Sequence, residues 1–168
     1  MQTTTQEDLK VENELIQWMQ DFVEQPNPKL GNWAPCPYAR AARINGKIKI
    51  VEGDDPFVDL ANLHAIEDWA YEVYVFWYPT ETYSPETFSE MSKQLNTLYM
   101  PENIVILEDH PRLVEKVNNV QMNFGKASLL IVQRLDDLNA AADKLREKGY
   151  YDHWSQEEID EVVTWRYK

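Results

Sequence analysis

The sequence predicts an α/β protein, with α+β as the alternative: a single mixed sheet of about four strands with helices packed on it. Four short apolar segments typical of strands recur along the chain, and most of them are separated by segments in which apolar residues have helical spacing. The last two strands have no clear helix between them, which disfavours a purely parallel sheet. With 168 residues and 43% hydrophobic content, we expect one domain spanning residues 1–168, with residues 1–5 disordered.

The first half of the chain is expected to begin with two helices. Apolar residues recur at three- and four-residue steps over 6–24, and the segment 26–31, rich in proline and glycine, ends this helix. A short second helix is expected to begin at Pro37. The alternating segment 47–53 predicts a strand with one solvated face, and 54–69 predicts a helix because Asp-Asp-Pro offers an N-cap.

The clearest strand covers residues 72–78. Both of its faces are apolar, so we expect it to lie at the centre of the sheet, covered on both sides. A helix then begins with Ser-Pro-Glu at residue 84 and ends at Pro101. The short apolar segment 103–107 predicts the next strand.

The last third of the chain predicts one strand and two helices. The segment 111–120 is expected to form a helical turn or two, and 127–133 predicts the fourth strand. Asp136 or Asp137 is expected to cap a helix that a glycine ends. The segment 155–158, Ser-Gln-Glu-Glu, is a capping box for the final helix.

Charge and composition limit the classes of partner. The net charge of −13 disfavours binding to nucleic-acid phosphates or to anionic lipid, so no nucleic-acid or membrane partner is expected. The polar N-terminus lacks the apolar core of a signal peptide, and the longest apolar run, 73–78, is far too short to span a bilayer. A single cysteine permits no internal disulfide, so we expect a reducing, cytoplasmic location.

Cys36 is the first candidate site residue. Pro37 disfavours a helical backbone at Cys36 and suits the first helical position, so the cysteine is expected at the N-cap. There the sulfur would face free backbone N–H groups and the positive end of the helix dipole, which both favour a thiolate. The alternative is that Cys36 packs as a small apolar residue.

Two arginines follow the cysteine at helical spacing. Arg40 lies one turn on and can lean back over Cys36, and Arg43 lies three residues further along a neighbouring part of the same face. A thiol with two guanidinium groups at a helix start would suit a small carboxylate or phosphate. Alternatively, both arginines pair with the abundant acidic residues.

The order of several short motifs resembles that of an uncharacterised bacterial domain family with a Leu-Cys-Pro-Phe-Ala signature. Its members carry a tryptophan in the first helix, then the signature, and later strands that end in His-Pro. The counterparts here are Trp18, Gly31 with Asn32, Cys36-Pro37-Tyr38-Ala39, Tyr78-Pro79, His110-Pro111 and the segment 129–134. Tyr78 and Ile131 stand where the family carries histidine, so no role that needs several histidines is implied.

The resemblance implies no activity, but it implies that Cys36, His110 and Arg134 converge. In open α/β sheets ligands gather beyond the strand ends, and His110 and Arg134 each follow or end a predicted strand. A Cys36–His110 pair would allow thiol catalysis with His110 as base, and Arg134 would hold an anionic group. Alternatively, His110 is a turn residue whose imidazole meets Asp109 or Glu108.

The sequence indicates no metal or cofactor. Its three histidines and single cysteine lack the close spacing of zinc ligands, and there is no glycine-rich phosphate loop. Two functions are predicted as alternatives: a small-anion or thiol-dependent site at Cys36, or a noncatalytic acidic interaction protein, of viral or accessory-gene origin, that binds a basic protein. The many aromatic residues favour a homodimer as the assembly.

Overall fold

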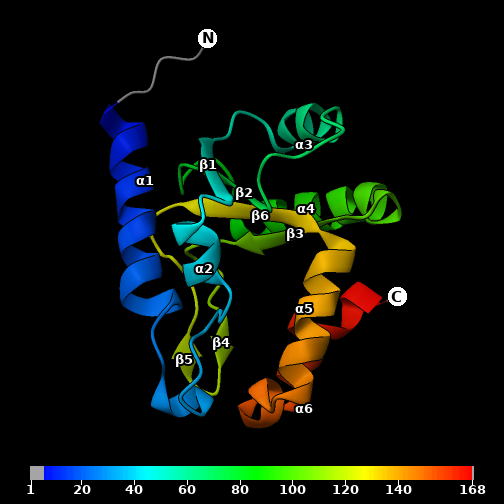
Figure 1. Ribbon diagram of the computed structural model, residues 1–168. Helices are drawn as coiled ribbons and strands as arrows, with labels where there is room; N and C mark the ends of the chain where they lie inside the picture. The colour runs from blue at the N-terminus through cyan, green and yellow to red at the C-terminus, as the bar shows by residue number, and fades with distance from the viewer. Residues whose placement is uncertain (1–5, 168) are drawn as a thin grey trace.

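The computed structural model describes residues 6–167, so the prediction for residues 1–5 lies outside the described part of the chain. Four strands form a mixed sheet in the order β1-β2-β6-β3, with helices packed around it (Figure 1). β1 and β2 are parallel, whereas β6 runs antiparallel to both of its neighbours. The predicted α/β class and the mixed sheet are confirmed.

The elements follow the predicted order, with one addition between β3 and β6. The strands are β1 (Ile48–Glu52), β2 (Val73–Tyr78), β3 (Ile104–Asp109), β4 (Lys116–Val117), β5 (Val120–Gln121) and β6 (Ser128–Arg134). The α-helices are α1 (Gln6–Trp18), α2 (Ala39–Ile44), α3 (Pro56–His64), α4 (Pro85–Tyr99), α5 (Leu135–Glu147) and α6 (Gln156–Val162). Shorter helices are the π-helix η1 (Met19–Val23) and the 3-10 helices η2 (Pro28–Leu30), η3 (Met100–Glu102), η4 (Tyr150–His153) and η5 (Thr164–Tyr167).

Helices pack against both faces of the sheet. On one face, which we call the α3/α4 face, Tyr74 and Phe76 of β2 pack against Leu60 of α3 and Phe88 of α4. On the other, the α1/α2 face, Val75 and Trp77 of β2 pack against Leu15 of α1 and Ala39 of α2. The central, doubly covered position predicted for β2 is confirmed, because side chains of successive strand residues point to opposite faces.

The segment predicted as a helical turn is a β-hairpin. β4 and β5 are joined by Asn118 and Asn119, whose φ angles are +47° and +66°. Positive φ at both central residues is typical of a type I′ turn, which matches the twist of paired strands, and asparagine tolerates this conformation. Val117 and Val120 of the hairpin are buried with Leu30 in a small cluster of their own.

The start of α6 and the end of α5 confirm the sequence signals, whereas the start of α5 does not. Ser155 and Glu158 form the predicted capping box at the start of α6. Gly149 follows the last residues of α5 with a φ of +87°, as expected for a helix end. α5, however, begins at Leu135 and has no side-chain cap. Asp136, one of the two predicted caps, instead joins the helix to Asn103, which precedes β3.

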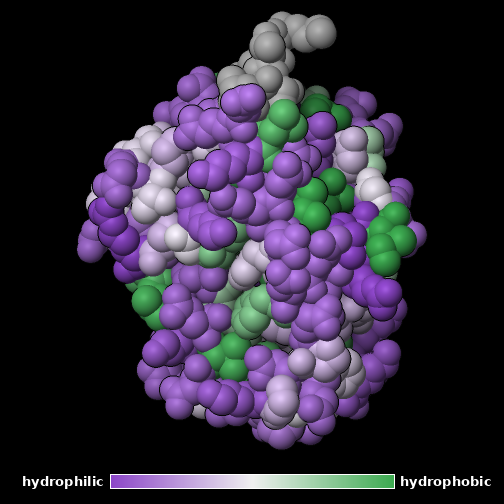
Figure 2. All heavy atoms as spheres, turned by 90° about the vertical axis from the view of Figure 1, so that its left-hand side faces the viewer, coloured by the Kyte–Doolittle hydropathy of each residue, from purple (hydrophilic) through white to green (hydrophobic). Residues whose placement is uncertain are grey.

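One side of the molecular surface is mostly hydrophilic. Figure 2 shows mostly hydrophilic residues on the side that lies at the left of Figure 1, with apolar residues set apart from one another. No helix in the described range 6–167 combines the length and the apolar character needed to cross a bilayer.

Candidate functional site

Cys36 lies in the turn before α2. The helix begins at Ala39 with Tyr38 at the N-cap, because Pro37 lies in a turn closed by the N–H of Ala39 and the carbonyl oxygen of Cys36. The predicted helix start at Pro37 is therefore wrong. Desolvation raises the pKa of the Cys36 thiol, N–H groups of Tyr38 and Ala39 lower it, Glu24 raises it, and the net direction is upward. The residue is exposed, and the raised pKa of its thiol favours the protonated form over the thiolate.

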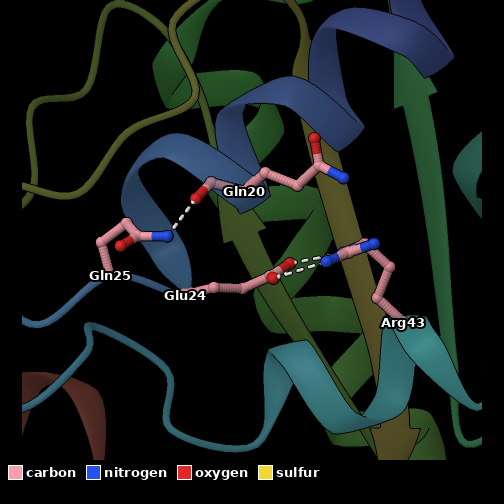
Figure 3. Close-up of polar contacts among 4 residues, drawn as sticks. All are labelled: Gln20, Glu24, Gln25 and Arg43. Atoms are coloured by element: carbon pink, nitrogen blue, oxygen red, sulfur yellow. Dashed lines mark hydrogen bonds and ion pairs between the residues drawn. The ribbon is translucent and has the colours of Figure 1, made fainter.

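Arg43 is held by an acidic partner. Its Nε and Nη2 atoms donate to the two carboxylate oxygens of Glu24 at 2.7 and 2.8 Å (Figure 3). The Glu24 side chain is 2% exposed, so this bidentate pair connects the residue after η1 with α2. Arg40 is exposed and is absent from the groups that shift the pKa of Cys36. The arrangement favours the ion-pairing alternative for Arg43.

His110 is a buried residue that holds a turn together. Only 1% of its surface is exposed. Its Nε2 lies 2.8 Å from the carbonyl oxygen of Tyr83, to which it donates, and its Nδ1 accepts from the N–H of Arg112 at 3.1 Å. Both ring nitrogens are therefore engaged, which favours the turn-residue alternative over a general base. The partners are Tyr83 and Arg112 instead of the expected Asp109 or Glu108.

Arg134 stands far from the other predicted site residues. Its guanidinium stacks on the ring of Trp69 at 3.8 Å. Arg134 pairs with Ile104 at the first residue of β3, whereas His110 follows the last, so the two lie at opposite ends of the sheet. Cys36 precedes α2, on the face opposite the α4 residues that His110 contacts. The predicted convergence of Cys36, His110 and Arg134 is wrong, because antiparallel pairing separates the ends of β3 and β6.

A groove of about 1210 Å³ lies beside β3. Its floor includes Leu107 and Ile131, which are direct cross-strand partners on the α1/α2 face. Both side chains are only half-buried, because α1 and α2 cover the β1–β2 half of this face and leave the β3 half open. The groove is therefore an uncovered part of the apolar sheet.

Elements from both ends of the chain form the walls of this groove. Trp18 and Met122 line one side, and Val162 and Trp165 line the other. In Figure 1 α1 passes along the left side of the sheet with the β4–β5 hairpin below, and α5 and α6 descend from the sheet on the right. Two tryptophans and a methionine provide large apolar surfaces that can adapt to a bound side chain.

Carboxylates gather at one end of the groove. Asp109 is buried, accepts hydrogen bonds from Asn123 and the N–H of Phe124, and has a pKa that desolvation raises. Glu115 is exposed as a residue, but the pKa of its carboxyl group is raised to about 7, first by desolvation and then by repulsion from Asp109, Glu108 and Glu161. All four acidic residues line the groove, and we call them the carboxylate cluster.

Within residues 6–167 the carboxylate cluster forms no ion pair, although Lys93 is close enough to lower the pKa of Glu108. The ion pairs of this range involve none of its four members, namely Glu108, Asp109, Glu115 and Glu161. Oε2 of Glu108 is buried and accepts no hydrogen bond from the described residues. Lys93 and Lys116 also line the groove, so four formal negative charges face two positive ones. The groove can therefore accept positive charge at this end.

The outer edge of β3 runs along the groove and is closed at its middle. Asn96 of α4 donates from Nδ2 to the carbonyl oxygen of Ile106 at 2.9 Å and accepts from its N–H at 2.8 Å. A strand added here would have to displace this side chain. The groove therefore offers side-chain surfaces to a ligand in place of a free strand edge.

No group of three or more histidine, cysteine, aspartate or glutamate residues in the range 6–167 has an arrangement that could hold a metal ion. The groove is not evident from the sequence because its floor comes from two strands and its walls from segments far apart along the chain. The one available signal was the group Glu108, Asp109 and Glu115 close in sequence after an apolar strand. Comparison with family models, with curated proteins and with solved structures gives no match.

Proposed function

We propose that this chain is a noncatalytic binding protein that captures a basic, amphipathic polypeptide segment in the groove beside β3. One observation carries the proposal: an apolar floor and a carboxylate cluster that forms no ion pair within residues 6–167 share the same groove. Apolar side chains of the segment would cover Leu107 and Ile131. Its lysine or arginine groups would meet the cluster formed by Glu108, Asp109, Glu115 and Glu161.

The size of the groove favours a polypeptide over a small molecule. Sites for drug-sized ligands have volumes of about 300–1,000 Å³, and this groove has about 1210 Å³. A peptide that lays one apolar face on an apolar groove gains affinity from burial, while charged groups at the rim set its orientation and speed its association. The net charge of −13 adds a long-range attraction for a basic partner.

A small-anion site receives less support from the described residues. Arg43 is occupied by Glu24, Arg134 is stacked on Trp69, and the thiol of Cys36 has a raised pKa. An anion in the groove would also face the carboxylate cluster, at an unfavourable Coulomb energy.

The test uses a fluorescein-labelled peptide of lysine and leucine with helical spacing, and a second peptide with glutamate in place of lysine. Fluorescence anisotropy should show saturable binding of the lysine peptide and none of the glutamate peptide. Glu161→Gln should weaken binding several-fold. Glu157→Gln removes the same charge from the same helix, at an exposed position outside the groove, and should leave binding nearly unchanged.

Equal weakening by Glu161→Gln and Glu157→Gln would mean that the peptide responds to net charge alone. That result, or the absence of saturable binding, would overturn the proposal. Trp165→Ala tests the apolar wall separately, because it removes a lining ring and no charge. It should also weaken binding, and this loss should persist at high salt, where screening removes most of the electrostatic contribution.

A further inference from the structure

β1 has an outer edge whose backbone groups are unpaired. It is the end strand of the sheet on the side opposite β3. The N–H of Gly53 donates to Trp77 at 2.8 Å and the carbonyl oxygen of Lys47 accepts from Val73 at 3.1 Å, so odd-numbered residues of this strand bond to β2. Because strand residues alternate in direction, the N–H and C=O groups of Ile48, Ile50 and Glu52 point away from the sheet. No residue between 6 and 167 pairs with them.

The two edge strands of the sheet differ in whether a side chain pairs with their outward backbone groups. On β3, the side chain of Asn96 occupies both outward groups of Ile106. On β1, no side chain in the described range takes this role, and all five residues of the strand are half-buried or exposed. Natural proteins usually cover, charge or block such edges, because unpaired strand edges recruit other strands. The outer edge of β1 is therefore available to a partner strand.

We propose that a second copy of this chain adds its β1 antiparallel to this edge, so that two four-stranded sheets join into one sheet of eight strands. The outward groups fix the register. Ile50 lies opposite Ile50 of the second copy, and Ile48 lies opposite Glu52 of the second copy. The two-fold axis also places Glu52 opposite Ile48 of the second copy, and each of the three pairs exchanges two main-chain hydrogen bonds. The contact is self-complementary about a two-fold axis, as in most homodimers.

Charge complementarity identifies the partner as another copy. Exposed Lys47 and Lys49 lie at the start of the strand, and exposed Asp54 follows its end. Antiparallel pairing places Lys47 of one copy beside Gly53 of the other, next to Asp54. Parallel pairing would align lysines with lysines, which is unfavourable. The strand thus carries the opposite charges that its own antiparallel copy requires.

Apolar side chains flank this edge on the neighbouring elements. Ile44 ends α2 just before the strand and is 60% exposed, and Val58 of α3 just after it is 50% exposed. Leu9 of α1 is 49% exposed and follows Asp8, whose carboxyl hydrogen-bonds to Glu52 at the end of β1. A second copy placed on this edge would bring these surfaces close to its own, and burial of Ile50 against its counterpart adds an apolar pair.

The test is sedimentation velocity of the full chain over a concentration series, with charge-swapped variants. The unmodified chain should show a monomer–dimer equilibrium. K47E/K49E should weaken self-association roughly tenfold or more, and D54K should do the same, because each puts like charges side by side. An equimolar mixture of the two variants should restore the dimer, since each then meets opposite charge. All three positions are exposed, so both variants are expected to fold.

Backbone amide exchange tests the register. On dimerisation, the amides of Ile48, Ile50 and Glu52 should become slow, whereas those of Lys49 and Val51 should be slow at every concentration. A monomer up to millimolar concentration, a dimer insensitive to both variants, or a dimer with fast exchange at Ile50 would each overturn the proposal. The groove beside β3 lies at the other edge of the sheet, so Glu161→Gln should leave dimerisation unchanged, and the two proposals fail independently.

Discussion

The side-chain amide of Asn96 pairs with the backbone of Ile106 in both directions, at 2.9 Å and 2.8 Å. The amide thus acts as a one-residue substitute for a fifth strand on the outer edge of β3. This contact keeps the edge closed where it borders the groove, so that ligand recognition there depends on side chains. It also fixes α4 to β3, and residues of both elements line the groove.

Asn96→Ala should open this edge. The variant leaves the N–H and C=O groups of Ile106 without their partner, and we expect a loss of about 1 kcal/mol in the free energy of unfolding. The amide of Ile106 should exchange faster with solvent. Gln94→Ala, at an exposed position on the same helix, serves as the control. Unchanged exchange at Ile106 in Asn96→Ala would show that the edge is protected by something other than this amide.

The pH dependence of stability should report the carboxylate cluster. The folded protein raises the pKa of Glu115 from 4.5 to about 7, first by desolvation. Between these two values the folded state keeps a proton that the unfolded chain releases, so the contribution of Glu115 to the free energy of unfolding falls as pH rises. Chemical denaturation at both ends of this window should show a smaller fall for Glu115→Gln than for the unmodified chain. An equal fall in both would contradict the assigned environment.

Peptide binding should depend on pH in the opposite sense. Glu115 gains its negative charge as pH rises through about 7, so a lysine-containing peptide should bind more tightly above this pH than below it. Isothermal titration calorimetry at two pH values checks the direction. Glu115→Gln should remove most of the difference, and a peptide that binds equally well on both sides of pH 7 would contradict the role given to Glu115.

The thiol of Cys36 should react slowly. Desolvation raises its pKa above the ordinary value, so the thiolate fraction at neutral pH is small. Alkylation by iodoacetamide, followed against pH, should give an inflection above that of a free cysteine in an unfolded peptide. An inflection below it would restore the thiol-dependent hypothesis. Cys36→Ser should leave peptide binding unchanged, since Cys36 is absent from the residues that line the groove.

Local signals in the sequence predicted most of the fold. The capping box at Ser155 and Glu158 depends on four consecutive residues, and the central position of β2 follows from apolar residues on both of its faces. The hairpin was missed because its strands have two residues each and show no periodicity. Asn118 and Asn119 between two valines were the signal available for its turn.

The candidate site could not be predicted from local signals. The floor of the groove depends on β3 pairing with β6 in an antiparallel register, which places Leu107 against Ile131. The same pairing separates His110 from Arg134, which the sequence analysis had brought together. The Arg43–Glu24 pair was equally hard to predict. The sequence indicated Arg43 as a candidate site residue, but it did not indicate which acidic residue pairs with it.

The most direct test of the account is methyl NMR of the chain titrated with the lysine–leucine peptide. If the peptide binds in the groove, chemical-shift changes should concentrate on the methyl groups of Leu107, Ile131 and Val162, which line it. The methyl groups of Leu60 and Leu130, in the core of the α3/α4 face, should stay unchanged. Shifts spread over the acidic helices without saturation at the floor of the groove would contradict the central claim that this groove is a binding site.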